Sequence, residues 1–196
     1  ITRQGARRAM RYAFELAWAK GKHKVTAVDK VNVLPDLYGL WREVFREVAR
    51  EYPEIETEFA FADATAMWFV KKPETYGVVV MPNLFGDVLT DLGAEITGGL
   101  GFAAGGNINP AGVSMFEPIH GSAPDIAGKK ISNPLASVWS ASQMLDFFGH
   151  EDWGKKLIDV IERVMVEKKA LTPDMGGTAT TDQVGDEVVR VLCEMQ

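Results

Sequence analysis

Cysteine is nearly absent from this sequence. Cys193 is the only one among 196 residues, so no disulfide can form within the chain. Long apolar runs are absent as well, and none approaches the ~20 residues that a helix needs to cross a bilayer. No secretory signal is recognisable either. We therefore expect a protein of the reducing cytoplasm with no membrane partner.

Positive charge is scarce too. Lys and Arg number 21 against 27 Asp and Glu, which gives a formal net charge of −6. The one basic cluster, Arg3, Arg7, Arg8 and Arg11, follows a helical pattern and is typical of a solvated helix face. The charge balance argues against a nucleic-acid partner.

Hydrophobic residues make up 46% of the chain, enough for one large domain or two small ones. In the first half, helical and strand patterns alternate, which predicts an α/β fold with a parallel sheet covered by helices. The predicted helices span 3–20, 37–52, 63–72 and 84–97, and the predicted strands span 23–28, 55–62 and 77–81. Thr2 is a candidate N-cap, and Gly21 follows the first helix.

The composition changes near residue 98. Residues 98–134 are rich in Gly, Pro and Asn and contain one strand candidate, "SMFEPI". Asn133 is expected to cap a helix with Pro134 at its first position, and Thr180 with Gln183 forms a capping-box pattern. The predicted helices here span 134–148, 152–168 and 181–195. We expect two parts, 1–97 and 98–196.

Polar side chains follow three predicted strands of the first part. In open α/β sheets, ligands gather beyond the carboxyl ends of the strands. One interpretation needs no ligand, because each of these residues can be explained singly as a surface lysine, an N-cap aspartate or an aspartate favoured by the helix dipole. The other interpretation is a shared ligand site. The residues are Lys30 and Asn32 after the first strand, Asp63 after the second, and Asn83, Asp87 and Asp91 after the third.

Asp87 and Asp91 stand four residues apart on a predicted helix. Two carboxylates at this spacing repel each other by roughly 0.2–0.5 kcal/mol, which a cation between them would offset. Together with Asp63 they offer hard oxygen ligands suited to Mg²⁺ or Mn²⁺, and the absence of His and Cys from the group argues against zinc. Lys30 is a candidate general base beside them.

The segment "EPIHGSAPDIAGKKISNP", residues 117–134, is a second candidate site. It does not match the dinucleotide fingerprint G-x-G-x-x-G, and the nearby "GGLGFAAGG" lacks the P-loop lysine. One interpretation is an irregular connecting loop. The other is a cradle whose amides face phosphate and whose Asp125 accepts from ribose hydroxyls.

Two long stretches resemble one family. "NLFGDVLTDLGAEITGGLGF" is similar to the metal-site segment of the β-decarboxylating dehydrogenases, and "FEPIHGSAPDIAGKKISNP" to their cofactor loop. This family acts on 3-isopropylmalate, isocitrate, homoisocitrate or tartrate/D-malate. "VDKVNVL" with "DATAM" is most similar to the isopropylmalate and homoisocitrate branch.

The resemblance implies an isopropylmalate/isocitrate dehydrogenase-like fold that is not a Rossmann fold, and roles for individual residues. Lys30 would be the general base, and Asp63, Asp87 and Asp91 would hold Mg²⁺ or Mn²⁺. Lys30 and Asp63 would serve the partner's site in a homodimer or higher even homo-oligomer, so residues 1–97 would be dimer-forming and 98–196 cofactor-binding. Asn32 and Val33 would line the substrate and nicotinamide region, and Glu117, His120, Gly121, Ser122, Ala123, Asp125, Ile126 and Asn133 the NAD site.

The implied reaction is NAD-dependent oxidative decarboxylation of a 2-hydroxy acid bearing a 3-carboxylate. We expect 3-isopropylmalate, as in leucine biosynthesis, with homoisocitrate, isocitrate and tartrate/D-malate as alternatives. The family chain is nearly twice as long, and the chain opens on Ile1. We therefore expect an absent amino-terminal part that holds the substrate arginines and a catalytic tyrosine. A non-catalytic regulatory or assembly subunit of the same fold is the alternative from another class.

Overall fold

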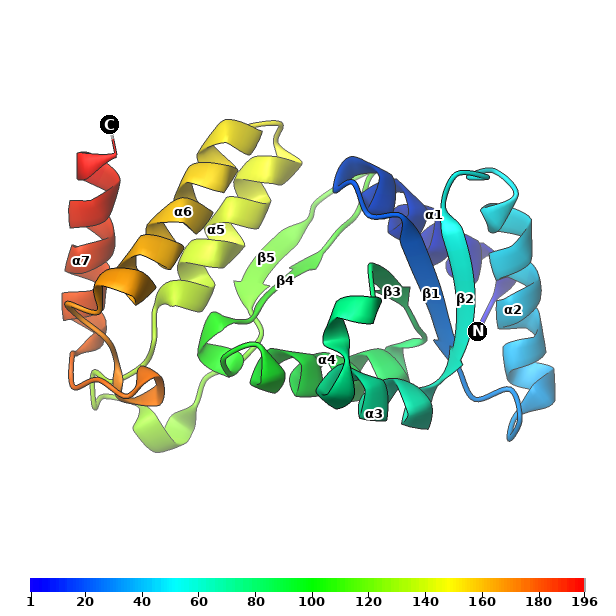
Figure 1. The fold of residues 1–196 in the computed structure, drawn as a ribbon, viewed down its shortest axis with the longest axis horizontal. Coiled ribbons are helices and arrows are strands. Elements are labelled where there is room, and N and C mark those ends of the chain that lie inside the picture. The colour runs from blue at the N-terminus through cyan, green and yellow to red at the C-terminus, as the bar shows by residue number, and fades with distance from the viewer. Residues whose placement is uncertain (196) are drawn as a thin grey trace. The chain divides into compact units, whose positions relative to one another are not determined.

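The computed structural model describes residues 1–195 as two compact units (Figure 1). The amino-terminal unit is Ile1–Ile96, and the carboxyl-terminal unit begins at Thr97. None of the helices within the described residues has the length and apolar character needed to cross a membrane.

A parallel sheet forms the centre of the amino-terminal unit, in the order β2-β1-β3. The strands are β1 (Lys24–Asp29), β2 (Glu56–Phe61) and β3 (Val78–Val80). The register runs from Lys24 opposite Glu56 to Asp29 opposite Phe61. Strand β1 lies between the other two strands and is buried over Val25–Asp29, so the backbone that leads into the next residue, Lys30, is held in place by the sheet.

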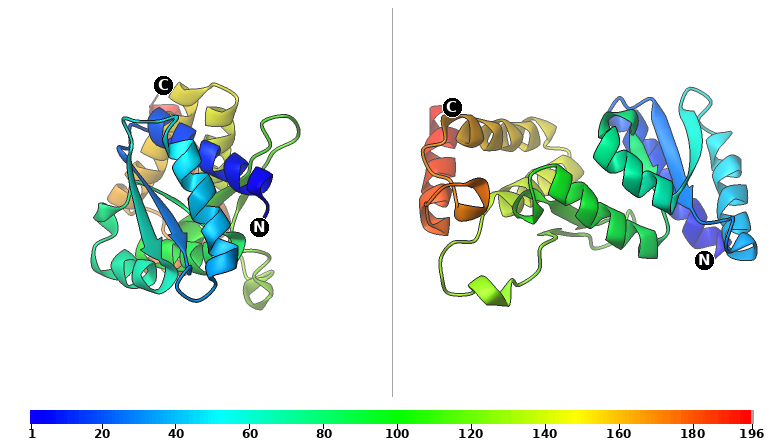
Figure 2. Two further views of the ribbon diagram at one scale, coloured as in Figure 1. Left: turned by 90° about the vertical axis from the view of Figure 1, so that its right-hand side faces the viewer. Right: turned by 60° about the horizontal axis from the view of Figure 1, so that its bottom comes forward.

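Four helices flank this sheet: α1 (Arg3–Ala19), α2 (Pro35–Ala49), α3 (Ala62–Lys71) and α4 (Asn83–Ile96). Helices α1 and α2 lie side by side (Figure 2) and form the core with β1. The core side chains Phe14 and Phe45 have ring centroids 5.4 Å apart. Helices α3 and α4 contact each other. The sheet and helices predicted from the first half of the sequence are confirmed.

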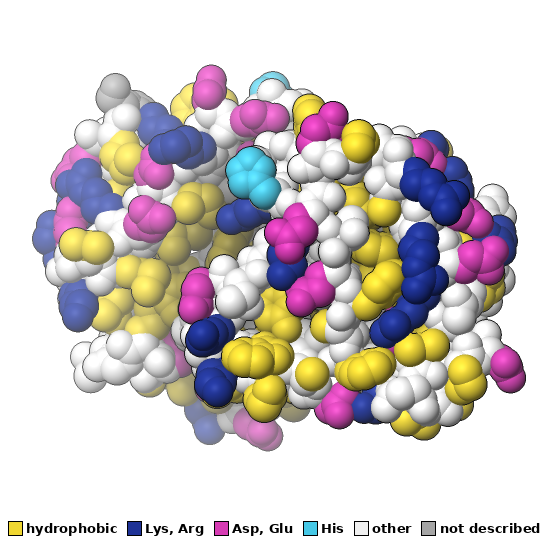
Figure 3. All heavy atoms as spheres, turned by 45° about the vertical axis from the view of Figure 1, so that its right-hand side comes forward, with side chains coloured by type: hydrophobic (Ala, Val, Ile, Leu, Met, Phe, Trp, Pro, Cys, Tyr) yellow, Lys and Arg dark blue, Asp and Glu magenta, His cyan; other side chains and the backbone are white. Residues whose placement is uncertain are grey.

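The predicted solvated face of α1 is an ion-paired face. Three of its arginines, one turn apart, contact three glutamates at the same spacing, of which two lie in α2 and the third, Glu51, lies two residues after its end. Exposed pairs of this kind contribute little to stability individually, because water and salt screen them. Figure 3 likewise shows acidic and basic side chains next to one another on the face it draws. The pairs are Arg3 with Glu43 and Glu47, Arg7 with Glu47 and Glu51, and Arg11 with Glu51.

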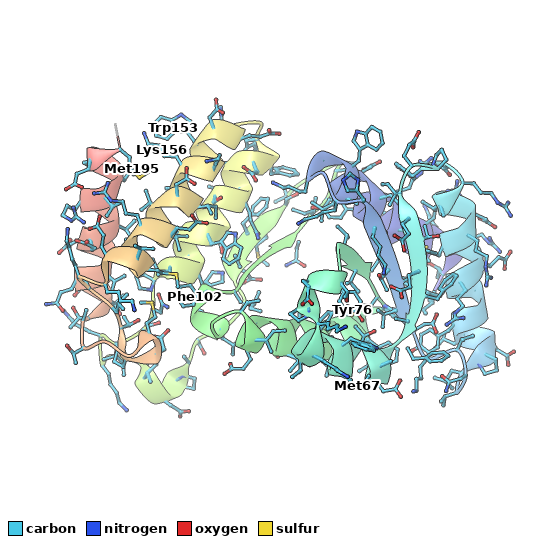
Figure 4. All side chains as sticks on the ribbon, in the orientation of Figure 1. Met67, Tyr76, Phe102, Trp153, Lys156 and Met195 are labelled. Carbon is cyan, nitrogen blue, oxygen red and sulfur yellow. The ribbon has the colours of Figure 1, made fainter. Side chains whose placement is uncertain are left out.

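The carboxyl-terminal unit joins an antiparallel strand pair to three helices. The strands are β4 (Ala104–Asn107) and β5 (Met115–Pro118), and the helices are α5 (Leu135–Phe147), α6 (Glu151–Glu167) and α7 (Thr181–Glu194). Short 3₁₀ turns lie at Leu100–Phe102, Pro124–Ile126 and Pro173–Met175. At the start of α6, Lys156 lies 4.9 Å from the Trp153 ring (Figure 4).

Two expectations need correction in this unit. Strand β4, "AGGN", was not predicted, because two glycines and no β-branched residue give it no strand signal and only its pairing with β5 creates it. The helix predicted from Pro134 begins at Leu135 with Pro134 as its N-cap residue. Asn133 Oδ1 still accepts from the Leu135 amide at 2.9 Å. The capping box at Thr180 is confirmed.

An ion-pair network joins α6 to α7 through Glu167. Hydrogen bonds from Lys169, Arg163 and Arg190 lower the pKa of Glu167 from 4.5 to about 2. A carboxylate whose folded pKa is depressed contributes stability that is present above its unfolded pKa and is lost as pH falls through the folded value. The contribution of Glu167 is therefore lost between about pH 4.5 and pH 2.

We expect Glu167→Gln to flatten the pH dependence of stability. Thermal unfolding followed by circular dichroism from neutral to acid pH should show a smaller loss of Tm on acidification in this variant than in the parent. Glu162→Gln, at an exposed position of the same helix, is the matched control and should leave the slope unchanged. Equal slopes in parent and Glu167→Gln protein would contradict the network's role.

Candidate active site

Lys30 and Asp63 meet at the carboxyl edge of the parallel sheet. Lys30 directly follows β1, and Asp63 stands in the first turn of α3, which begins directly after β2. Because β1 and β2 are parallel neighbours in register up to Asp29 and Phe61, their following residues emerge together. Lys30 Nζ donates to Asp63 Oδ1 at 2.5 Å. The structure therefore brings together two residues that stand 33 positions apart in the sequence.

The pair is asymmetric in exposure. The Lys30 side chain is 25% exposed, whereas that of Asp63 is 70% exposed. The hydrogen bond from Lys30, assisted by amide hydrogen bonds at the start of α3, holds the pKa of Asp63 below its usual value. Asp63 is thus a carboxylate at neutral pH with oxygen lone pairs open to a ligand.

Asn32 and Val33 lie in the turn that follows Lys30, and both are exposed. The amides of Val33 and Leu34 donate to the Lys30 carbonyl at 2.9 and 3.0 Å. The turn therefore presents Asn32 and Val33 on the solvent side of the lysine, where they are free to meet a ligand.

Asp87 and Asp91 are exposed and stand one turn apart on α4. Asn83 Nδ2, at the start of the same helix, donates to Asp87 Oδ2 at 3.0 Å. Within residues 1–195, no three His, Cys, Asp or Glu side chains converge on a common metal position. The donors still fit a hard cation, because exposed carboxylates offer oxygen ligands that Mg²⁺ or Mn²⁺ completes with other groups. The metal role of Asp63, Asp87 and Asp91 stays a prediction.

The carboxyl-terminal unit contains a pocket of about 300 Å³ formed by the predicted cofactor loop and the start of α7. Five predicted cofactor residues line it: His120, Gly121, Ser122, Ala123 and Ile126. The rest of its lining comes from Ala127, Gly128, Lys130, Ser132, Thr181 and Asp182.

The loop keeps its shape through left-handed backbone conformations. Gly121 and Gly128 have φ of 65° and 76°, and Ala123 and Lys130 adopt φ of 43° and 54° although they carry a Cβ. Such conformations are uncommon without glycine, persist where the surroundings impose them, and cluster at ligand sites. Successive backbone amides in such a curved loop can bind an anionic group, so the loop suits a polar ligand of the size of a nucleotide moiety.

Three predicted cofactor residues lie outside this pocket lining. Glu117 is exposed on β5, and Asp125 is exposed in the turn Pro124–Ile126. Asn133 is buried, and its Nδ2 donates to Asp174 Oδ2 at 2.9 Å. Asn133 thus joins the start of α5 to the turn Pro173–Met175. Its cofactor role, like those of Glu117 and Asp125, stays a prediction.

Sequence reasoning missed the side of the pocket formed by α7. Thr181 Oγ1 donates to the Ser132 carbonyl at 2.6 Å, and the Thr181 amide donates to the Lys130 carbonyl at 2.9 Å. Lys130 Nζ lies 3.3 Å from Asp182 Oδ2. The capping box located this helix start, but no sequence signal joins it to a loop 50 residues earlier.

A family model described as isocitrate/isopropylmalate dehydrogenase matches residues 1–188. The chain belongs to this family. It is 47% identical over 190 residues to a probable tartrate dehydrogenase/decarboxylase of Bacillus subtilis, a match that covers 96% of this chain and 53% of that protein. It is 45% identical over 195 residues to the 3-isopropylmalate dehydrogenase of Thermobifida fusca, covering 98% and 54%.

The fold of this isocitrate/isopropylmalate dehydrogenase family member also matches solved structures. The crystal structure of isocitrate dehydrogenase from Methylococcus capsulatus aligns with a TM-score of 0.94 at 40% identity. That match covers 98% of this chain and 57% of the other. The chain therefore has the family's α/β fold and spans about half the length of the relatives it matches.

Proposed function

We propose that the protein catalyses NAD-dependent, divalent-metal-dependent oxidative decarboxylation of a 2-hydroxy acid with a 3-carboxylate. The observation that carries the proposal is the 2.5 Å contact of Lys30 with Asp63 at the carboxyl edge of the sheet. A family fold without a base and a ligand carboxylate at this position would have no means for the reaction. Similarity to dehydrogenases with several substrates supports the reaction class.

In this proposal Lys30 moves the proton of the reaction. Its Nζ donates to Asp63 in the structure, so it accepts the C2 hydroxyl proton only after it has given up one of its own protons and has exchanged that contact for one with substrate. The partly buried side chain restricts water around the ammonium group, and the turn after it holds the lysine backbone. Asn32 and Val33 orient the substrate beside it.

Asp63, Asp87 and Asp91 would hold Mg²⁺ or Mn²⁺. When bound, the cation supplies polarisation of the C2 oxygen and charge stabilisation as CO₂ is lost. Asn83 restrains the Asp87 carboxylate through its hydrogen bond, which reduces the freedom that the carboxylate must lose on binding.

NAD is the cofactor we propose for the pocket at His120–Ala123 and Ile126. Bound there, it supplies the acceptor for the C2 hydride. The pocket offers loop backbone, the Ser122 hydroxyl and the start of α7 to a polar ligand. We expect Asp125 to face the ribose of the cofactor, where its carboxylate would accept from the hydroxyls and disfavour the additional 2′-phosphate of NADP.

The substrate we favour is 3-isopropylmalate. The segment "VDKVNVL" supports it, and the 45% identity to a 3-isopropylmalate dehydrogenase is consistent with it. Tartrate is a second candidate substrate, because the chain is 47% identical to a probable tartrate dehydrogenase/decarboxylase. Homoisocitrate, isocitrate and D-malate complete the candidate substrates.

We further propose that the active form is a homodimer built on α3 and α4. These helices expose large apolar side chains, including Met67 at 53%, which projects outward from α3 (Figure 4), and Val70 at 64%. Leu84 and Val88 on α4 are 68% and 63% exposed. Apolar side chains gathered on two adjacent helices are typical of a protein–protein interface.

The test is a substrate panel for the intact protein with each nicotinamide cofactor. We expect NADH formation with CO₂ release, fastest with 3-isopropylmalate, and a kcat/KM for NAD at least about tenfold above that for NADP, the size of one charge–charge contact of ~1.4 kcal/mol. Asp125→Asn should lower that ratio of kcat/KM values, with Asp152→Asn as the control, because Asp152 is an exposed aspartate at the start of α6, a helix that does not line the pocket. A preference for NADP would contradict the role of Asp125, and no turnover of any candidate would contradict the proposed function.

A further inference from the structure

Asp29, the last residue of β1, is a fully buried carboxylate. Arg42 of α2 donates to both of its oxygens, from Nε at 2.6 Å and from Nη2 at 3.1 Å. The Val31 amide donates to Asp29 Oδ1 at 2.9 Å. Asp29 therefore fixes the chain on both sides of Lys30, because it occupies the preceding position and binds the amide of the following one.

Arg42 is itself held in place. Its side chain is 20% exposed, and its guanidinium lies 4.6 Å from the Phe59 ring and 5.5 Å from the Phe61 ring of β2. Lys30 Nζ lies 5.7 Å from the same Phe61 ring. Arg42 and Lys30 thus share one aromatic side chain, and that side chain directly precedes the helix that carries Asp63.

We propose that Asp29 and Arg42 are positioning residues for Lys30. Arg42 ties the end of β1 to the end of β2 and to α2, so the turn 30–34 leaves the sheet in one direction. A bidentate guanidinium contact restrains both position and orientation of a carboxylate, which a single ammonium contact does not. Neither residue touches substrate, and both act through the backbone of Lys30.

A burial argument supports a role beyond general stability. A buried ion pair recovers little of the cost of desolvating two charges, so stability alone is a weak reason to have one. An ion pair next to a reactive side chain can instead serve to fix the orientation of that side chain. This inference rests on the proposed function for its catalytic consequence, but not for its structural part.

The experiment compares Arg42→Met and Arg42→Lys with Arg46→Met. Arg46 stands one turn further along α2 and lies 5.0 Å from the Phe59 ring, so its replacement removes a similar cation–aromatic contact away from the Asp29 contact. Hydrogen exchange of the backbone amides measures the turn, and steady-state kinetics of the intact protein measures its consequence.

We expect faster exchange of the Val31, Val33 and Leu34 amides in Arg42→Met, with α1 and the rest of β1 unchanged. The kcat should fall about 10- to 100-fold, as for other residues that orient a reacting group, with little change in KM. Arg42→Lys should recover part of both losses, and Arg46→Met should show neither.

The outcomes separate the two proposals. Unchanged exchange in Arg42→Met would overturn the positioning role whether or not the enzyme is active. Faster exchange with unaltered kcat would also overturn it, because the turn would then be free to move without cost to the reaction. Absence of turnover in the parent protein would contradict the proposed function, and the exchange data alone would then decide whether Arg42 holds the turn.

Discussion

Replacing Lys30 with Ala should lower kcat by about 10²- to 10⁴-fold, the usual contribution of a positioned general base. Lys30 Nζ is the amine at the carboxyl edge of the sheet that contacts the candidate metal ligand Asp63. Steady-state NADH formation in the intact protein measures the loss. Added small primary amines should restore part of the rate, because they can occupy the space that the side chain leaves.

Lys24 provides a matched control for this substitution. It lies at the opposite end of β1, is 23% exposed, and its Nζ lies 2.7 Å from Glu58 Oε2 of β2. Lys24→Ala therefore removes a similar lysine–carboxylate pair without touching the proposed site. We expect it to keep kcat. A rate for Lys30→Ala within a few-fold of the Lys24→Ala rate would show that Lys30 is not the base.

Refolding two impaired variants together should restore activity if subunits share their sites, provided that the Mn²⁺ concentration is too low to saturate the Asp87→Asn variant. In a Lys30→Ala and Asp87→Asn hybrid dimer, one site draws Lys30 and Asp63 from the Asp87→Asn subunit and Asp87 and Asp91 from the other. That site is intact, and the second carries both defects. With random pairing about half of the dimers are hybrids with one working site, so about a quarter of the parent activity is the ceiling.

The matched control mixes Lys30→Ala with Asp63→Asn. Because these two residues would serve the same site, each site of that hybrid lacks one of them and no activity should return. Asp87→Asn alone should also raise the Kd for Mn²⁺ by about 10- to 100-fold. Replacing a residue that only orients a metal ligand has an effect of this size, so replacing a ligand should have at least that effect. Hybrids confirmed by mass that show no recovery would mean that each subunit builds its own site.

Local signals account for what the sequence predicted well. Periodicity located the helices of both units, and side-chain hydrogen bonds at Thr2 and Thr180 confirm two of the three predicted N-caps. The parallel sheet followed from alternating helix and strand patterns. From this sheet, the meeting of Lys30 and Asp63 could be predicted, since both residues follow neighbouring strands.

Long-range contacts account for what the sequence did not reveal. The strand identity of Ala104–Asn107 comes from its partner, and the contribution of Thr181 to the pocket comes from tertiary packing. The contact of Arg42 with Asp29 could not be predicted from the sequence, since an arginine on an amphipathic helix is ordinarily solvated. Only the folded chain shows that its guanidinium turns inward.

The order of ion pairs between α1 and α2 has a consequence for helix direction. Arg3, Arg7 and Arg11 meet glutamates whose numbers rise in the same order, so the two helices run parallel. Parallel neighbours place like ends of their macrodipoles together, which is unfavourable. Attraction between the arginine and glutamate rows opposes that repulsion along the shared length. The chain thus tolerates the helix direction that its α-β-α crossover imposes.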